Sequence, residues 1–255
     1  MHVEVAVTVV IPCYNEEATI GACLDRVACM DFVGEIVVVD DGSLDATAQA
    51  VAGKAVADRR IRLVRAGRNC GKAAAIRLGA GHAQGRIIVI HDADMIVSAD
   101  VLQAMIRAIE ERRCDIVIGS RFILPREERA IPASNLFGNK LLARSFSFLL
   151  GQRITDALCG VQALRKDDFL AMRFKRCRWG DLDILVGGRQ LGLRVGEYPV
   201  PYFRRRGGKS KMRPLYDTFI FTKVTFEALF QLKIKPYFAG SGRSRQTSRT
   251  ADPGE

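Results

Sequence analysis

Apolar runs rich in β-branched residues alternate with segments of helical period along this chain. The runs and the segments between them predict strands over residues 5–11, 36–39, 61–64 and 87–90, and helices over residues 16–30, 45–57 and 72–83. Strands that alternate with helices of this length form βαβ units, which build a mainly parallel sheet with helices on both faces. The sequence therefore predicts an α/β protein that binds polar ligands at the carboxyl ends of its strands.

The rhythm breaks in the second half of the chain, after a predicted helix over residues 99–112 and a strand over 115–119. Pro125 and Pro132 flank a charge-rich stretch and predict a loop, which leads to an apolar helix over residues 135–150.

We divide residues 1–213 into a nucleotide-binding half, residues 1–97, and an acceptor half, residues 98–213. Beyond them we expect an amphipathic helix over residues 214–236 and a disordered tail, rich in Ser, Gly and Arg, over residues 237–255.

The chain has 255 residues, of which 48% are hydrophobic, so it is long enough to bury a substantial core. It has no run of about 18 uncharged apolar residues, and its first residues lack the layout of a signal peptide, so we expect a cytoplasmic protein. Seven cysteines without a CxxC pair indicate reduced thiols and, with only three histidines, argue against a structural zinc site.

The formal net charge of +11 is unevenly distributed, because much of the basic excess lies beyond residue 170. Such a concentration indicates an anionic partner. The cluster lacks interleaved aromatic residues and a recognition-helix pattern, so we expect no nucleic acid partner. A phosphorylated substrate or an anionic membrane surface fits the charge at least as well.

Carboxylates follow two of the predicted buried strands. Asp40 and Asp41 end one strand, and Asp92 and Asp94 end another. Two carboxylates one residue apart at a strand end suit a divalent cation and its phosphate partner. The alternative is a strand-end turn whose acids are only solvated.

The first strand leads into Tyr14 and the acidic residues Glu16 and Glu17. A nucleoside base can stack on Tyr14, although an acidic helix start also complements the helix dipole. At the second strand end, we expect either Asp40 or Asp41 to hold a ribose hydroxyl or a base edge.

Several motifs together have the order and spacing of glycosyltransferase family 2, and the chain resembles that family over about its first 215 residues. The motifs are Pro12-Cys13-Tyr14-Asn15-Glu16, Asp40-Asp41-Gly42-Ser43, Asn69-Cys70-Gly71-Lys72 and Asp92-Ala93-Asp94. Three further segments, residues 119–122, 155–163 and 205–211, resemble the polyprenyl-phosphate branch of the family, which is similar to dolichol-phosphate mannose synthase.

The resemblance implies a GT-A fold and an inverting transfer of a sugar from a UDP- or GDP-sugar to a polyprenyl phosphate, with Mg²⁺ or Mn²⁺ as the cofactor. It implies nucleotide-sugar contacts for Pro12, Tyr14, Glu16, Val39, Asp41, Lys72, Asp92 and Ala93. It also implies metal binding by Asp92 and Asp94, catalysis by Asp94, and phosphate contacts for Arg121, Arg205 and Lys211.

The chain departs from the branch at Ile96, where a Gln often assists the ion, so the ion would depend on the two acids, phosphate oxygens and water. It also has Asp181 and Asp183 at the start of a predicted helix, and they resemble the acidic position that serves as the base in relatives with hydroxyl acceptors. One alternative is therefore a sugar hydroxyl as the acceptor, with Asp181 or Asp183 as the base. Another is that either acid only caps the helix.

A lipid acceptor implies peripheral attachment to the cytoplasmic face of a membrane. The basic run 204–211 can close over the donor as a lid or attract lipid headgroups. The helix from Pro214 can lie in the membrane interface, pack on the domain, or join two copies of the chain. An alternative of a different class is a non-catalytic module that binds nucleotide-sugars or serves as a membrane scaffold.

Overall fold

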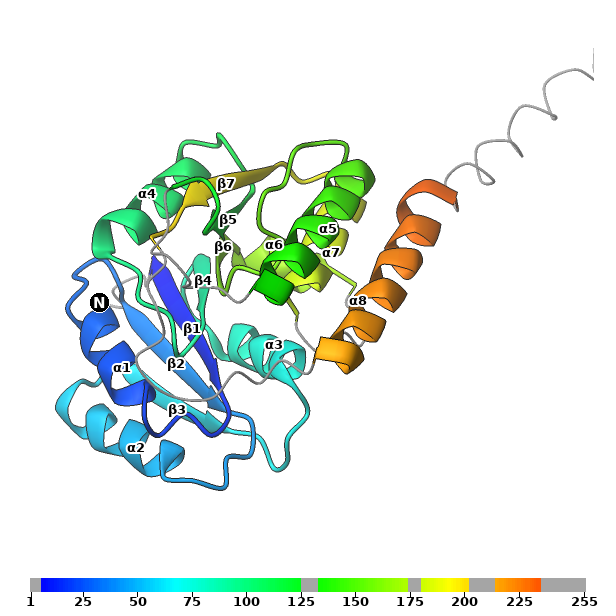
Figure 1. Ribbon diagram of the computed structural model, residues 1–255. Coiled ribbons are helices and arrows are strands. Elements are labelled where there is room, and N and C mark those ends of the chain that lie inside the picture. The colour runs from blue at the N-terminus through cyan, green and yellow to red at the C-terminus, as the bar shows by residue number, and fades with distance from the viewer. Residues whose placement is uncertain (1–5, 125–132, 174–179, 202–213, 235–255) are drawn as a thin grey trace, which may run out of the picture.

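The computed structural model describes residues 6–124, 133–173, 180–201 and 214–234 (Figure 1). Within these residues one seven-stranded sheet has the order β3-β2-β1-β4-β6-β5-β7. Neighbouring strands are parallel except at β6, which runs antiparallel to both β4 and β5. The strands are β1 (Val7–Cys13), β2 (Glu35–Asp40), β3 (Ile61–Arg65), β4 (Ile87–His91), β5 (Ile116–Ser120), β6 (Val161–Arg165) and β7 (Val195–Pro199). The expected α/β fold with a mainly parallel sheet is confirmed.

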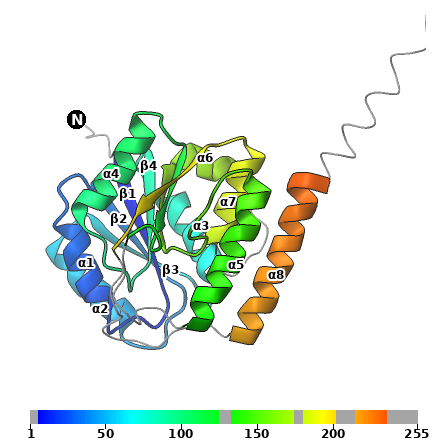
Figure 2. The ribbon, with the colours of Figure 1, turned by 45° about the horizontal axis from the view of Figure 1, so that its top comes forward.

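Helices cover both faces of the sheet (Figures 1 and 2). The helices are α1 (Ile20–Ala28), α2 (Thr47–Ala57), α3 (Lys72–His82), α4 (Ala99–Glu110), α5 (Ala133–Leu150), α6 (Lys166–Ala171), α7 (Asp181–Gln190) and α8 (Pro214–Leu229), which continues into the π-helical turn η1 (Phe230–Ile234). Buried side chains of α1, α2 and α4 form the core on one face, and those of α3, α5 and α7 form the core on the other.

The strand residues explain this two-sided core, because successive side chains point to opposite faces of a sheet. On β4, Val89 belongs to the cluster with α1 and α4, whereas Ile88 and Ile90 belong to the cluster with α3 and α5. A strand that is covered on both faces needs apolar residues at every position. The unbroken apolar runs in the sequence reflect this burial.

The first helix begins later than the sequence predicts, at Ile20 instead of residue 16. Residues 15 and 16 instead bind the loop between β2 and α2. The Leu44 amide donates to Asn15 Oδ1 at 2.9 Å, and the Glu16 amide donates to Thr47 Oγ1 at 2.8 Å. The loops at the ends of β1 and β2 therefore form one hydrogen-bonded unit at the carboxyl edge of the sheet.

Helix α8 packs lengthwise against α5 (Figures 1 and 2). Phe221 and Val224 face the core cluster to which α5 contributes Leu142 and Phe146, and Ala228 is fully buried. The predicted tail over residues 237–255 lies outside the described residues.

Gly79 tests how closely α3 packs on the sheet. A Cβ at this position would overlap Cγ1 of Val10 and lie 2.9 Å from Cγ2 of Val39, whereas Gly81 on the same helix faces open space. We expect Gly79→Ala to lower the free energy of unfolding by about 1–3 kcal/mol, because both neighbours belong to the sheet. Gly81→Ala should leave it unchanged or raise it by up to about 1 kcal/mol. Urea unfolding followed by circular dichroism measures both variants, and equal stabilities would contradict the close packing.

Candidate functional site

A largely buried lysine joins three elements at the carboxyl edge of the sheet. Lys72 begins α3, Asp92 follows β4, and Asp181 begins α7. Lys72 Nζ lies 2.8 Å from Oδ1 and 3.1 Å from Oδ2 of Asp92. It also lies 3.0 Å from each carboxylate oxygen of Asp181. One ammonium group therefore bridges a carboxylate of the first half of the chain and a carboxylate of the second.

Burial and charge determine how Lys72 and Asp181 titrate. Burial by itself would lower the pKa of Lys72, but the two carboxylates raise it above its usual value, so Lys72 stays charged. Burial raises the pKa of Asp181 to about 6, against the effect of Lys72 and with a further contribution from Asp92. The site thus combines a fixed positive charge with a carboxyl group that takes up a proton just below neutral pH.

The space beside Asp92 is available only because residue 160 is glycine. The Asp92 amide donates to the carbonyl oxygen of Gly160 at 2.9 Å. A Cβ at Gly160 would overlap the Asp92 carboxylate. The loop that precedes β6 therefore fixes the backbone of Asp92 and leaves room for its side chain.

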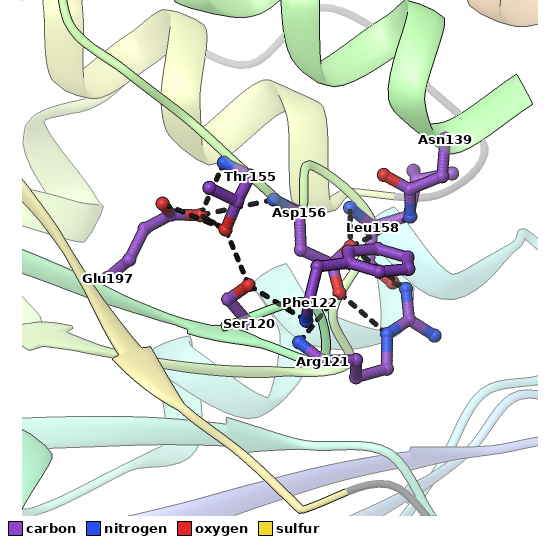
Figure 3. A network of polar contacts seen from close by, with 8 residues as sticks. All are labelled: Ser120, Arg121, Phe122, Asn139, Thr155, Asp156, Leu158 and Glu197. Carbon is purple, nitrogen blue, oxygen red and sulfur yellow. Dashed lines mark hydrogen bonds and ion pairs between the residues drawn. The ribbon is translucent and has the colours of Figure 1, made fainter. Parts of the chain in front are cut away.

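A second buried ion pair holds that loop against the end of β5 (Figure 3). Arg121 Nε donates to Asp156 Oδ2 at 2.6 Å, and Arg121 Nη2 donates to Asp156 Oδ1 at 2.9 Å. Asn139 of α5 also donates to Asp156, at 2.8 Å. Burial would raise the pKa of Asp156, but Arg121 and Asn139 together hold it below its usual value.

Glu197 of β7 supports the same loop from the other side (Figure 3). Its Oε1 accepts hydrogen bonds from the amides of Thr155 and Asp156, at 2.8 Å and 3.1 Å. The hydroxyl groups of Thr155 and Ser120 lie 2.6 Å apart. Strands β5 and β7 and helix α5 therefore all fix residues 155–158.

The acids after β2 fix backbone turns in the structure. Asp41 accepts hydrogen bonds from the amides of Cys70 and Gly71, at 2.9 Å and 2.7 Å. Asp40 accepts one from the amide of Ser43, at 2.9 Å. Asp41 thus holds the turn before α3 and so helps place Lys72. Its contact with a nucleoside stays a prediction.

The remaining predicted nucleotide contacts lie on neighbouring strand ends. Pro12 and Val39 are buried and stand opposite each other in the pairing of β1 with β2. Tyr14 and Glu16 follow β1 and are partly exposed, and Ala93 is buried between Asp92 and Asp94. These residues lie along adjacent strands of one edge, and their contacts with a nucleotide-sugar stay predictions.

Asp94 is partly exposed, so it is accessible from solvent. The described residues contain no group of three or more His, Cys, Asp or Glu side chains placed to hold a metal ion. Asp183 is buried near the start of α7. Arg205, Lys211 and the proposed lid over residues 204–211 lie outside the described residues, so the structure does not place them.

Several supporting residues have no predicted role in the sequence: Asn139, Asp156, Gly160 and Glu197. Asp156 and Gly160 lie in a segment that resembles the family, but the local sequence does not indicate what they contact. The residues that contact each other are far apart in the sequence: Arg121 and Asp156 are separated by 35 residues, and Asp156 and Glu197 by 41. The antiparallel strand β6, which the alternating pattern did not predict, and the pairing of β7 with β5 bring them to this edge.

A family model described as "Glycosyl transferase family 2" matches residues 8–173. A dolichyl-phosphate beta-glucosyltransferase of Trichomonas vaginalis is 31% identical over 230 residues, which are 82% of this chain and 67% of that protein. The enzyme of the same name from Drosophila melanogaster is 29% identical and covers 82% of this chain and 70% of its own. A dodecaprenyl-phosphate galacturonate synthase of Rhizobium johnstonii is 27% identical, over 80% of this chain and 61% of its own.

Solved structures show the same fold. Glucosyl-3-phosphoglycerate synthase from Mycobacterium tuberculosis, in complex with Mn²⁺, uridine-diphosphate-glucose and phosphoglyceric acid, matches with a TM-score of 0.68 and 20% identity. The match covers 89% of this chain and 79% of that one. At this identity the likeness shows a shared GT-A fold alone.

The raised pKa of Asp181 predicts a pH dependence of stability. The folded protein keeps a proton on Asp181 up to about pH 6, whereas the unfolded chain loses it near its usual value of 3.8. This contribution is therefore fully present below about pH 4 and is lost as the pH rises to about 6. We expect the wild type to lose roughly 1–3 kcal/mol over this window relative to Asp181→Asn, measured by urea unfolding in EDTA. Asp31→Asn, which changes an exposed carboxylate, serves as the control, and parallel pH curves for wild type and Asp181→Asn would contradict the raised pKa.

Proposed function

This chain belongs to glycosyl transferase family 2 and is a glycosyltransferase, and we propose that it transfers a sugar from a UDP- or GDP-sugar to a polyprenyl phosphate, with inversion. The names of its relatives support a lipid-phosphate acceptor, because they specify dolichyl phosphate or dodecaprenyl phosphate. The structural neighbour from Mycobacterium tuberculosis supports a UDP-sugar donor, since that enzyme was solved in complex with uridine-diphosphate-glucose.

The Lys72 ion pair is the observation that carries the choice of acceptor. A hydroxyl acceptor needs a base that takes its proton, whereas a phosphate is already ionised. Both oxygens of Asp181 face the Lys72 ammonium group, and Asp181 and Asp183 are both buried. Because Asp181 is buried and both of its oxygens contact Lys72, it is not exposed to the hydroxyl group of an acceptor. We therefore assign Asp181 to the positioning of Lys72.

We assign the donor site to the edge formed by β1, β2 and β4. We assign the nucleoside to the partly exposed Tyr14 and Glu16 and to Pro12, Val39 and Asp41, which are buried beside them at the same strand ends. Lys72 provides a buried positive charge next to Asp92. A cation at this place favours the negative charge of a diphosphate.

The carboxylates of Asp92 and Asp94 fit a divalent cation that takes its other ligands from the substrate and from water. Mg²⁺ and related ions are usually bound through one or two carboxylates, with phosphate oxygens and water as the other ligands. The described residues offer two such oxygen donors in sequence and no larger ligand cluster. An ion held here, Mg²⁺ or Mn²⁺, would be bound by the two carboxylates together with phosphate oxygens of the donor. It would offset the charge of the leaving diphosphate.

The reaction then needs little proton chemistry from the protein. An acceptor phosphate oxygen forms a bond to the anomeric carbon, and the bond from that carbon to the diphosphate oxygen breaks. The electron pair leaves with the nucleoside diphosphate. The work of the chain is to align the two substrates on opposite sides of the sugar and to offset their charges. Arg121, Arg205 and Lys211 are the cations we assign to the phosphate groups.

An extraction assay tests the proposed function. Purified protein is incubated with radiolabelled UDP- and GDP-sugars, polyprenyl phosphate and Mg²⁺ or Mn²⁺, followed by organic extraction. We expect label in the organic phase for one donor, loss of that label in EDTA, and at least about a hundred-fold lower turnover for Asp94→Asn, whose circular dichroism should match the wild type. Nucleotide binding without turnover and without metal dependence would instead support a non-catalytic binding module.

Replacement of the two acids of α7 distinguishes the acceptor classes. We expect Asp181→Asn and Asp183→Asn to keep turnover within about ten-fold of the wild type at pH 7.5, because a phosphate acceptor requires no base. At position 181, Asn also keeps an oxygen for Lys72. Loss of a catalytic base typically costs about 10²- to 10⁴-fold. A loss of that size in either variant, with KM unchanged, would favour a hydroxyl acceptor.

A further inference from the structure

Helices α5 and α8 present large apolar side chains to solvent. Leu141 and Phe148 of α5, Phe219 and Phe226 of α8, and Phe230 of η1 are each between 56% and 68% exposed. We call these five residues the aromatic face. They recur at spacings of seven or four residues, which keeps them on one side of each helix. Single exposed apolar residues are ordinary, but five on two adjacent helices indicate a surface that is covered in use.

Helix α8 is apolar on both sides, which explains why this surface needs a partner. Its inner side packs Phe221, Val224 and Ala228 toward the core on α5. Its outer side carries Phe219 and Phe226, which pack on nothing equivalent within the described residues. A helix side that carries large apolar side chains is normally buried. Here the protein buries only one half of it.

Positive charges lie among these aromatic rings. Of the described side chains on α5, α8 and η1, the exposed charged ones are all basic: Lys140, Arg144, Lys223 and Lys233. The ammonium group of Lys233 lies 5.4 Å from the centre of the Phe148 ring, which connects the two helices across the face. Glu227 is partly buried.

The combination of exposed apolar side chains and basic residues indicates which kind of partner covers the aromatic face. A symmetric contact with a second copy of the chain would place the basic residues of one face against those of the other. A bilayer with anionic headgroups accepts both parts, because aromatic rings enter the boundary of the acyl chains while lysines extend to the phosphates. We propose that the aromatic face of α5 and α8 docks the protein on an anionic lipid bilayer.

The docked orientation has a consequence for the site. The N-terminal ends of α5 and α8 lie toward the edge of the sheet at which the strands end (Figures 1 and 2). A bilayer along both helices therefore adjoins the edge with Lys72 and Asp92. No described helix is long and apolar enough to span that bilayer, so attachment through this face is peripheral. Delivery of the acceptor to this edge rests on the proposed function, but the docking itself does not.

Vesicle sedimentation tests the docking without substrate or metal. Vesicles of phosphatidylcholine with about one third phosphatidylglycerol should bind the wild type, and vesicles of pure phosphatidylcholine should bind it more weakly. The double variant Phe219→Ser and Phe226→Ser should weaken binding to anionic vesicles at least ten-fold. Lys223→Gln with Lys233→Gln should weaken it about five-fold per lysine on anionic vesicles and hardly at all on neutral ones.

Val56→Ser is the control, because Val56 is also an exposed apolar residue, at 87%, but lies on α2, away from this face. It should bind vesicles as the wild type does, and circular dichroism should show that all variants keep the fold. Docking is overturned if the wild type does not bind anionic vesicles or if the Phe variants bind as well as Val56→Ser. It is also overturned if sedimentation shows a dimer that only the Phe changes dissociate. Vesicle binding without glycosyl transfer would leave the docking intact and refute the proposed function.

Discussion

The rest of the site depends on one ammonium group placed between two carboxylates. Lys72 begins a helix of the first half of the chain, Asp92 ends a central strand, and Asp181 begins a helix of the second half. Asp181 is buried and Lys72 and Asp92 are only partly exposed, and this removal of charge from water is tolerated because each group contacts an opposite charge. Removing one partner of such a buried pair typically costs about 3–5 kcal/mol. The two halves of the protein are therefore connected by the same groups that border the proposed donor site.

A second ion pair between oppositely charged side chains lies at the end of β5, on the other side of β6. Arg121 and Asp156 form a two-bond ion pair at the end of β5, and Asn139 and Glu197 complete the support of that loop. The loop in turn accepts the Asp92 amide through Gly160. Because these groups are already ordered, substrates do not have to arrange them on binding, which is the main way a protein of this kind can lower a barrier.

The chemistry of the acceptor and the surface of the protein agree. A lipid phosphate needs no proton acceptor, and the carboxylate nearest to that role is paired with Lys72. A lipid also has to be taken from a bilayer, and α5 and α8 carry an exposed aromatic and basic surface beside the same edge. The two observations are independent, since one concerns the interior of the site and the other the outer side of two helices.

The sequence by itself determined the alternation of strands and helices, the family and the strand-end positions of Asp41, Asp92 and Asp94, because apolar periodicity and short motifs are local. It did not indicate β6, which runs against the parallel pattern, or the roles of Asp156 and Gly160 beside it. Only the tertiary structure decided that Lys72 contacts both Asp92 and Asp181, since these residues are 20 and 109 positions apart from it. Contacts over such distances depend on how the sheet brings strand and helix ends together, and no local spacing encodes that.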